Sequence, residues 1–384
     1  MTSEPTRTWA WKSKDEVRWT VAGPDFTLAL LAGKAGFVAL DEAGKELWRG
    51  EPHDYSGAWV NDDTKTIQAS WYGPITATAG GDTTSDSGTI VYDYDGKVLW
   101  KDTNDDHFVQ SVEKDDTFLI HDSEAKTLRK MQRPDDKGAW TIPAENVTLT
   151  DDWIYAIDGD TLARYSRKDG AADWKVDLPA GWKGPKQWYD VNLGVTDDLV
   201  VVVGYATYGL STDKGASLWK QSGDGAVVRT AGDRLAVIEE GQYDEAQEMT
   251  MPSHGPYPIY DASGKVGSLP FSTANPYGAV QMLKVDGDGA QVNFGPDDGA
   301  LYDAAGKAQE KGYEHAYQAL DDGCYLVDGA TVSFRTWHEK TAAWTLPLEG
   351  VESVEDKVNH RDVYVGVGDG RLVINDKHNV WLYE

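Results

Sequence analysis

The stretch that decides the fold is Val91-Tyr92-Asp93-Tyr94-Asp95-Gly96-Lys97-Val98-Leu99-Trp100. Both ends are rich in β-branched and aromatic residues, which favour strands, and the central Asp-Gly pair is typical of a tight hairpin turn. The stretch therefore predicts strand, turn, strand. The same pattern returns at 40–48 and around Trp174, Trp219, Gly264, Gly306, Trp344 and Trp381.

The residues of the turns recur at fixed spacing, and this spacing allows the repeats to be counted. Asp-x-x-Gly-Lys occurs at 41–45, 93–97, 261–265 and 303–307. A glycine stands four residues before a tryptophan in the pairs Gly44 and Trp48, Gly96 and Trp100, Gly170 and Trp174, and Gly215 and Trp219. We expect each glycine to supply the positive φ of a tight turn and each aspartate to accept hydrogen bonds from the turn amides. We expect the tryptophans to lie on the last strand of each repeat and to cover the gap between neighbouring sheets.

Nine end marks follow from this pattern, at Trp48, Trp100, Trp140, Trp174, Trp219, Ser268, Glu310, Trp344 and Trp381. Their spacing runs from 34 residues (310 to 344) to 52 residues (48 to 100). Repeats of this length that hold several short strands are typical of β-propellers. Acidic pairs at 115–116, 151–152, 197–198 and 321–322 precede further strands and predict hairpin turns. The repeat is therefore expected to be a four-stranded antiparallel blade.

The repeat sets the expected domain boundaries. Residues 1–14 are polar enough to predict a tail or linker, and residues 15–384 are expected to form one closed all-β propeller. The strand around Trp19 is expected to meet the strand 380–383, because that pairing would remove exposed sheet edges.

The segment from Asp152-Trp153-Ile154-Tyr155-Ala156 to Trp174 resembles the quinoprotein-type (PQQ-like) repeat, as do 363–372 and 40–48. In pattern the chain is similar to the non-enzymatic BamB-like propellers of bacterial envelopes. That resemblance implies eight blades, so eight are expected, with nine as the alternative that the marks allow. It also implies protein binding and an extracytoplasmic or envelope location, reached with or without an anchor segment before Met1. A cytoplasmic location is left open.

The composition of the chain limits the classes of partner that it could bind. The net charge of −28 disfavours binding to nucleic acid or to an anionic membrane surface. No apolar run approaches the length of a membrane span, so this segment is not expected to insert into a bilayer. The single cysteine, Cys324, allows no intrachain disulfide and is expected to be a small buried residue at a strand start. We expect a monomer that binds a protein partner.

No catalytic residue or cofactor is predicted. The chain shows no nucleophile elbow, phosphate loop or His-Glu-x-x-His motif. The resembling family includes quinone dehydrogenases, many of which use a disulfide between adjacent cysteines, and one cysteine cannot form that bond. The alternative left open is an enzyme that hydrolyses glycosides with paired carboxylates at the propeller mouth.

The longest apparent insertion, 241–258, carries the candidate binding residues. Met249, Met251 and His254 are soft-metal ligand types and form a weak candidate metal site. The same residues, together with Tyr243 and Tyr257, are the candidates for contact with a protein partner. An ordinary surface loop is the third alternative.

Overall fold

The computed structural model describes residues 3–73, 76–77, 83–84, 87–104, 106–132, 138–179, 182, 193–204, 206–222, 225–231, 233–244, 249–252, 256–269, 280–285, 288–293, 300–303, 307–313, 316–320, 322–351, 363–368 and 370–384. The chain divides into two compact units. The first comprises Met1–Thr141, Val327–Phe334 and Ala342–Glu384, and the second Ile142–Leu326 and Arg335–Thr341. Strands dominate the described ranges, where the one helix is the short 3-10 turn η1 (Gly33–Ala35).

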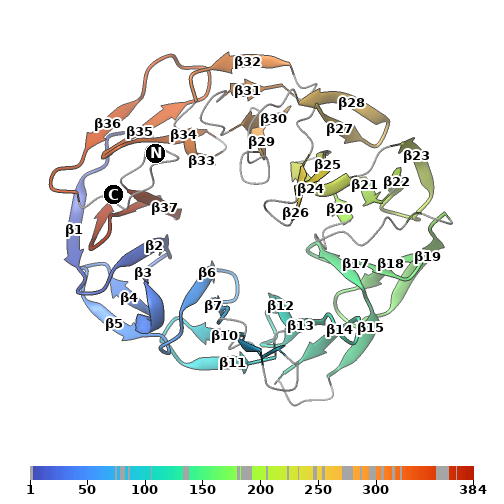
Figure 1. Ribbon diagram of the computed structural model, residues 1–384, viewed down its shortest axis with the longest axis horizontal. Coiled ribbons are helices and arrows are strands. Elements are labelled where there is room, and N and C mark those ends of the chain that lie inside the picture. Colours follow the sequence, from blue (N-terminus) through green and yellow to red (C-terminus); the bar gives the residue numbers. More distant parts are fainter. Residues whose placement is uncertain are drawn as a thin grey trace. The chain divides into compact units, whose positions relative to one another are not determined.

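The repeated element is a four-stranded antiparallel sheet (Figure 1). Sheets built mainly from the first unit contain β2 (Val17–Ala22), β3 (Phe26–Leu31), β4 (Phe37–Asp41) and β5 (Glu46–Arg49); β6 (Tyr55–Asn61), β7 (Thr66–Trp71), β10 (Gly88–Asp93) and β11 (Val98–Asp102); β12 (His107–Val112), β13 (Phe118–Asp122), β14 (Thr127–Met131) and β15 (Trp140–Pro143); and β37 (Tyr364–Gly368), β38 (Arg371–Asn375), β39 (Asn379–Tyr383) and β1 (Arg7–Lys12). A small separate hairpin joins β8 (Thr76–Ala77) to β9 (Thr83–Thr84).

The second unit repeats the same element. Its sheets contain β16 (Asn146–Leu149), β17 (Trp153–Asp158), β18 (Thr161–Ser166) and β19 (Ala172–Asp177); β20 (Leu193–Val195), β21 (Leu199–Val203), β22 (Ala206–Ser211) and β23 (Ser217–Ser222); β24 (Gly225–Ala231), β25 (Arg234–Asp244), β27 (Tyr257–Asp261) and β28 (Gly264–Leu269), with β26 (Met249–Pro252) added to β25; and β29 (Val280–Val285), β30 (Asp288–Asn293), β31 (Ala300–Tyr302) and β32 (Ala308–Lys311). A further sheet contains β33 (Ala316–Leu320), β34 (Gly323–Asp328), β35 (Thr331–Thr336) and β36 (Trp344–Pro347).

The fold class predicted from the repeat is confirmed: the chain is all-β and is built of four-stranded antiparallel propeller blades. The described residues form nine such sheets. This number equals the number of end marks in the sequence, so the expectation of eight blades was wrong. Eight of the marks lie on the fourth strand of a sheet, namely Trp48, Trp100, Trp140, Trp174, Trp219, Ser268, Glu310 and Trp344.

The ninth mark, Trp381, lies on a third strand, because the fourth strand of that sheet comes from the other end of the chain. Strand β1 pairs antiparallel with β39, with Ala10 opposite Trp381. Residues 7–12, expected to be part of a tail, are therefore a sheet strand. The strand that meets 380–383 is β1, whereas Trp19 lies on β2, which pairs with β3.

The turn glycines adopt the predicted conformation, and they also make room for a tryptophan. Gly44, Gly96, Gly170 and Gly215 all have positive φ, between 64° and 84°. A Cβ added at Gly96 would lie 2.5 Å from Cδ2 of Trp48, on the fourth strand of the preceding sheet. The aspartates also behave as predicted: the Asp93 carboxylate accepts hydrogen bonds from two amides of its own turn, at 2.8 and 3.1 Å.

This tryptophan contact joins consecutive sheets. The Trp48 indole donates a hydrogen bond to the Tyr94 carbonyl (2.9 Å), and Trp174 and Trp219 make the same bond to the next hairpin turn at 3.0 Å. Trp9 on β1 takes the equivalent place against Gly44. Trp100 departs from the pattern, because its buried indole nitrogen has no hydrogen-bond partner among the described residues and the ring packs on Phe118 instead.

Apolar side chains between neighbouring sheets form the core. One cluster lies between β2–β5 and the sheet of β6, β7, β10 and β11, and includes Phe37, Tyr55 and Tyr92. In the second unit an equivalent cluster packs Tyr155 and Leu162 against Val200 and Val202 of the next sheet. Burial between sheets explains why a second strand such as β21, Leu199–Val203, is a continuous apolar run that is buried throughout.

Cys324 lies at the start of β34 and is fully buried, as predicted. Burial raises the pKa of its thiol to about 12. No helix among the described residues has the length and apolar character required to cross a bilayer.

Candidate functional site

The predicted insertion forms a hairpin arm on a long strand. Strand β25 runs for eleven residues, of which Leu235 and Ala236 pair with β27. Its far half instead pairs with β26, where Glu240 lies opposite Pro252 and Asp244 opposite Met249. We call residues 240–252 the arm.

The candidate partner-binding residues are distributed over the arm and its base. Tyr243, on β25, lies opposite Thr250, on β26. Met249 and Met251 also lie on β26. Tyr257 belongs to β27 and is fully buried, so its side chain is withdrawn from any partner and that candidate is corrected. His254 lies outside the described residues.

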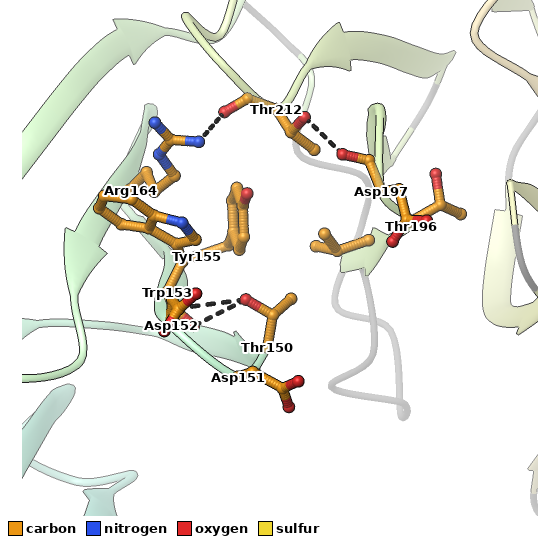
Figure 2. Close-up of a pocket in the computed structure, with 10 residues that line it drawn as sticks. Thr150, Asp151, Asp152, Trp153, Tyr155, Arg164, Thr196, Asp197 and Thr212 are labelled. Atoms are coloured by element: carbon orange, nitrogen blue, oxygen red, sulfur yellow. Dashed lines mark hydrogen bonds between the residues drawn. The ribbon is translucent and has the colours of Figure 1, made fainter.

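A pocket that the sequence did not predict lies between the two sheets β16–β19 and β20–β23 (Figure 2). Its volume is about 480 Å³, within the range of small-ligand sites. The lining residues are Thr150, Asp151, Asp152, Trp153, Tyr155, Arg164, Val195, Thr196, Asp197 and Thr212. All belong to the second unit.

Two equivalent turns form the rim of the pocket. The sequence Thr-Asp-Asp occurs at 150–152, between β16 and β17, and again at 196–198, between β20 and β21. In each turn the threonine amide donates to the carbonyl three residues on, Thr150 to Trp153 at 2.9 Å and Thr196 to Leu199 at 2.8 Å. The acidic pairs are therefore hairpin turns, as predicted. Their repetition on adjacent sheets brings carboxylates from two repeats to one rim.

Arg164 forms one wall of the pocket and links the two sheets. Its guanidinium stacks over the Trp153 ring, with Cζ 4.1 Å from the ring centroid, and forms an ion pair with Asp173. It also donates to the carbonyl of Thr212 at 2.5 Å (Figure 2). These contacts occupy the nitrogens of this guanidinium, so its charge is neutralised within the wall.

Tyr155 lies on the floor beside Arg164 and is almost fully buried. Burial raises the pKa of its phenol above the usual value, and the neighbouring guanidinium only partly offsets that effect. The hydroxyl is therefore protonated at neutral pH. The Thr212 hydroxyl, across the pocket, donates to the Asp197 carbonyl at 2.8 Å.

Three carboxylates of the rim carry unpaired charge. Asp151, Asp152 and Asp197 are exposed, and no side-chain hydrogen bond or ion pair reaches their carboxylates from the described part of the chain. Arg164 is neutralised by Asp173, and Arg167 donates to the Thr150 carbonyl at 2.7 Å, so three carboxylates outnumber the one remaining cation at the rim.

The equivalent turn in the first unit shows how such a charge is neutralised. There Asp115 forms an ion pair with Lys130 at 2.9 Å. Burial opposes ionisation of Asp115, but hydrogen bonds from Thr117 and Lys130 outweigh it and lower the pKa. Lys130 lies opposite Leu119 in its sheet, just as Arg164 lies opposite Tyr155. The same register position thus carries a cation in both sheets, but Arg164 is directed away from the rim.

No group of three His, Cys, Asp or Glu side chains in the described ranges is arranged to hold a metal ion. The sequence signal that could have located the pocket is the repeated Thr-Asp-Asp turn at 150–152 and 196–198. A sequence pattern could not show which way Arg164 turns, and that orientation decides whether the rim is neutral or acidic.

Comparison with known structures gives likeness at low identity. BamB from Moraxella catarrhalis is 11% identical over 99% of this chain and 100% of that chain, with a TM-score of 0.48. The computationally designed Ika8 protein is 10% identical over 82% of this chain and 94% of that chain, also with a TM-score of 0.48. The C-terminal WD40 domain of Sif2 is 8% identical over 100% and 99%, with a TM-score of 0.45. No protein-family model matches the sequence, and no curated protein matches it.

Proposed function

We propose that this chain is a non-enzymatic β-propeller scaffold that binds a protein partner through the arm, residues 240–252. The observation that carries the proposal is the length of β25, which continues beyond its pairing with β24 and β27 and there pairs with the additional strand β26. Most of the described chain builds repeated sheets, whereas the arm adds backbone beyond the four strands of its blade.

The chemistry of the arm supports an extended segment as the bound element. Within the described ranges β26 pairs with β25 alone, so its second edge offers backbone donors and acceptors to another strand. Addition of a strand to such an edge is a recurrent way for proteins to bind peptides. Two methionines, Met249 and Met251, lie on this strand, and methionine is a residue type that is common at adaptable binding surfaces.

The finer assignment rests on the sequence repeat. We propose membership of the PQQ-like, BamB-like group because the repeat residues follow that pattern from 40–48 to 363–372. An envelope location and a monomeric scaffold accompany that proposal.

The test compares three versions of the full chain in pull-downs from the envelope fraction of the native organism. One is intact, one has 241–254 replaced by a short Gly-Ser turn, and one has 74–86 replaced in the same way. The last is a matched control, because both segments join the second and third strands of a sheet.

We expect a partner that is recovered with the intact chain and with the 74–86 control but lost with the 241–254 variant. Titration of the purified partner should then show at least 10-fold weaker binding to the arm variant. Equal recovery and equal affinity for all three proteins would refute the proposal.

A further inference from the structure

We propose that the pocket between the sheets β16–β19 and β20–β23 binds an arginine side chain from a basic segment of a protein partner. The inference rests on the proposed function in so far as its ligand belongs to a protein, but it concerns a different surface from the arm. Four features carry it: the volume, the unpaired rim carboxylates, the neutralised Arg164 and the aromatic wall.

The volume and position suit an inserted side chain with its flanking backbone. The space of about 480 Å³ has one rim, and each of the two Thr-Asp-Asp turns forms one side of it. Asp151 and Asp152 belong to the turn on one side of the rim, and Asp197 belongs to the turn on the other side (Figure 2).

The charge of the lining selects a cation. Three exposed carboxylates lie near two guanidinium groups, of which Arg164 is paired with Asp173 and Arg167 donates to the Thr150 carbonyl at 2.7 Å. The first unit provides an internal reference, because there the equivalent Asp115 is neutralised by Lys130. Between β16–β19 and β20–β23 no ion pair joins a described cation to the three rim carboxylates, because Arg164 is paired with Asp173 and Arg167 donates to the Thr150 carbonyl. An external cation can therefore pair with them.

The wall favours a planar cation over a point charge. Trp153 already stacks a guanidinium at 4.1 Å, and the adjacent Tyr155 ring forms the floor. A guanidinium also matches carboxylates through its forked N–H groups and stacks on aromatic faces, which an ammonium does less well. Arginine is therefore the side chain that the pocket fits best.

The test measures binding of a labelled six-residue peptide with two adjacent arginines to the full chain by fluorescence anisotropy. A matched peptide carries citrulline, the neutral isostere, at both positions, and a third carries lysine. The pocket variant is Asp151→Asn, Asp152→Asn and Asp197→Asn together. The control variant, Asp25→Asn, Asp63→Asn and Asp95→Asn, changes the net charge equally at exposed positions outside the pocket.

We expect the pocket variant to weaken binding of the arginine peptide by about 10-fold, the loss anticipated for three exposed ion pairs. The control variant should change it less than about 2-fold, and the citrulline peptide should bind at least 10-fold more weakly. The lysine peptide should fall between these two. Matching urea unfolding curves for both variants and the unchanged chain would establish that folding is retained.

Three results would overturn the inference. Equal losses for pocket and control variants would show attraction to net charge alone. Equal binding of the citrulline and arginine peptides would remove the role of the cation. Spermidine that displaces the peptide at equimolar concentration, and itself depends on the three pocket carboxylates, would assign the site to a free polyamine. The 241–254 variant is tested with the same peptide. If it still binds the peptide but no longer recovers the protein partner, the pocket and the arm act separately.

Discussion

Substitution of Gly96 by alanine should destabilise the first unit well beyond the backbone cost of the change. Gly96 has a φ of +84°, which costs an alanine about 1–2 kcal/mol. The new Cβ would also lie 2.5 Å from Cδ2 of Trp48, so the indole must move. Displacement of the indole loses its 2.9 Å hydrogen bond to the Tyr94 carbonyl, worth about 1 kcal/mol.

The same displacement disturbs the packing of Trp48 on Tyr92, whose ring centroid is 5.4 Å away, at a further cost of about 1 kcal/mol. The expected loss is therefore about 3–4 kcal/mol in the free energy of unfolding. Gly370→Ala is the matched control. It also has positive φ, at 75°, but no atom lies within 4 Å of the added Cβ, so its cost should be about 1–2 kcal/mol.

Urea unfolding followed by tryptophan fluorescence measures both changes. A double-mutant cycle with Trp48→Ala isolates the contact, because Gly96→Ala in that background should cost only the backbone term. Equal destabilisation by Gly96→Ala and Gly370→Ala would refute the reasoning that Gly96 is required to make room for Trp48.

Four further outcomes are expected. Cys324 should resist iodoacetamide at pH 8 in the folded chain and react on unfolding, because its pKa of about 12 keeps the thiol protonated; mass spectrometry measures the adduct. Asp115→Asn should remove part of the acid sensitivity of folding: the lowered pKa stabilises the fold above pH of about 4 and that contribution is lost as the pH falls through the folded pKa, which urea titrations from pH 7 to 3 would detect. Arg335→Gln should cost about 3 kcal/mol in urea unfolding, since it leaves the largely buried Glu310 without its ion-pair partner. Deletion of residues 1–12 should lower the unfolding midpoint and promote association, because it exposes the edge of β39.

The repeat could be predicted from the sequence because its determinants are local. Asp93 and Gly96 specify a hairpin through contacts within their own turn. A tryptophan that follows such a turn, as Trp48 does, lies on the fourth strand of its sheet. The prediction that each mark lies on a fourth strand was wrong for Trp381. The fourth strand of its sheet comes from residues 7–12, and no residue near Trp381 in the sequence specifies that pairing. The number of sheets equals the nine end marks counted in the sequence. The wrong expectation of eight blades came from the resemblance to PQQ-like propellers.

The candidate sites were less accessible to sequence reasoning. The insertion at 241–258 was visible as extra length, but its division into an arm and the buried Tyr257 depends on strand register. The pocket depends on a rotamer: Arg164 and Lys130 occupy equivalent register positions, yet one is directed at the next sheet and the other at its own turn. Such a choice is made by packing between repeats and leaves no pattern in the sequence.

The pairing of β1 with β39 has a consequence for the order of events during synthesis. Thr6 and Glu384 exchange two backbone hydrogen bonds, at 2.7 and 3.0 Å, so β1 receives its partner only after β39, which lies far later in the sequence, has left the ribosome. Contacts of such long sequence separation form slowly. Until then β1 is an unpaired strand carrying Trp9 and Trp11, a segment suited to chaperone capture, while the intervening hairpins can fold as they emerge. The slowest step in the folding of these sheets is therefore expected to be the docking of β1 on β39.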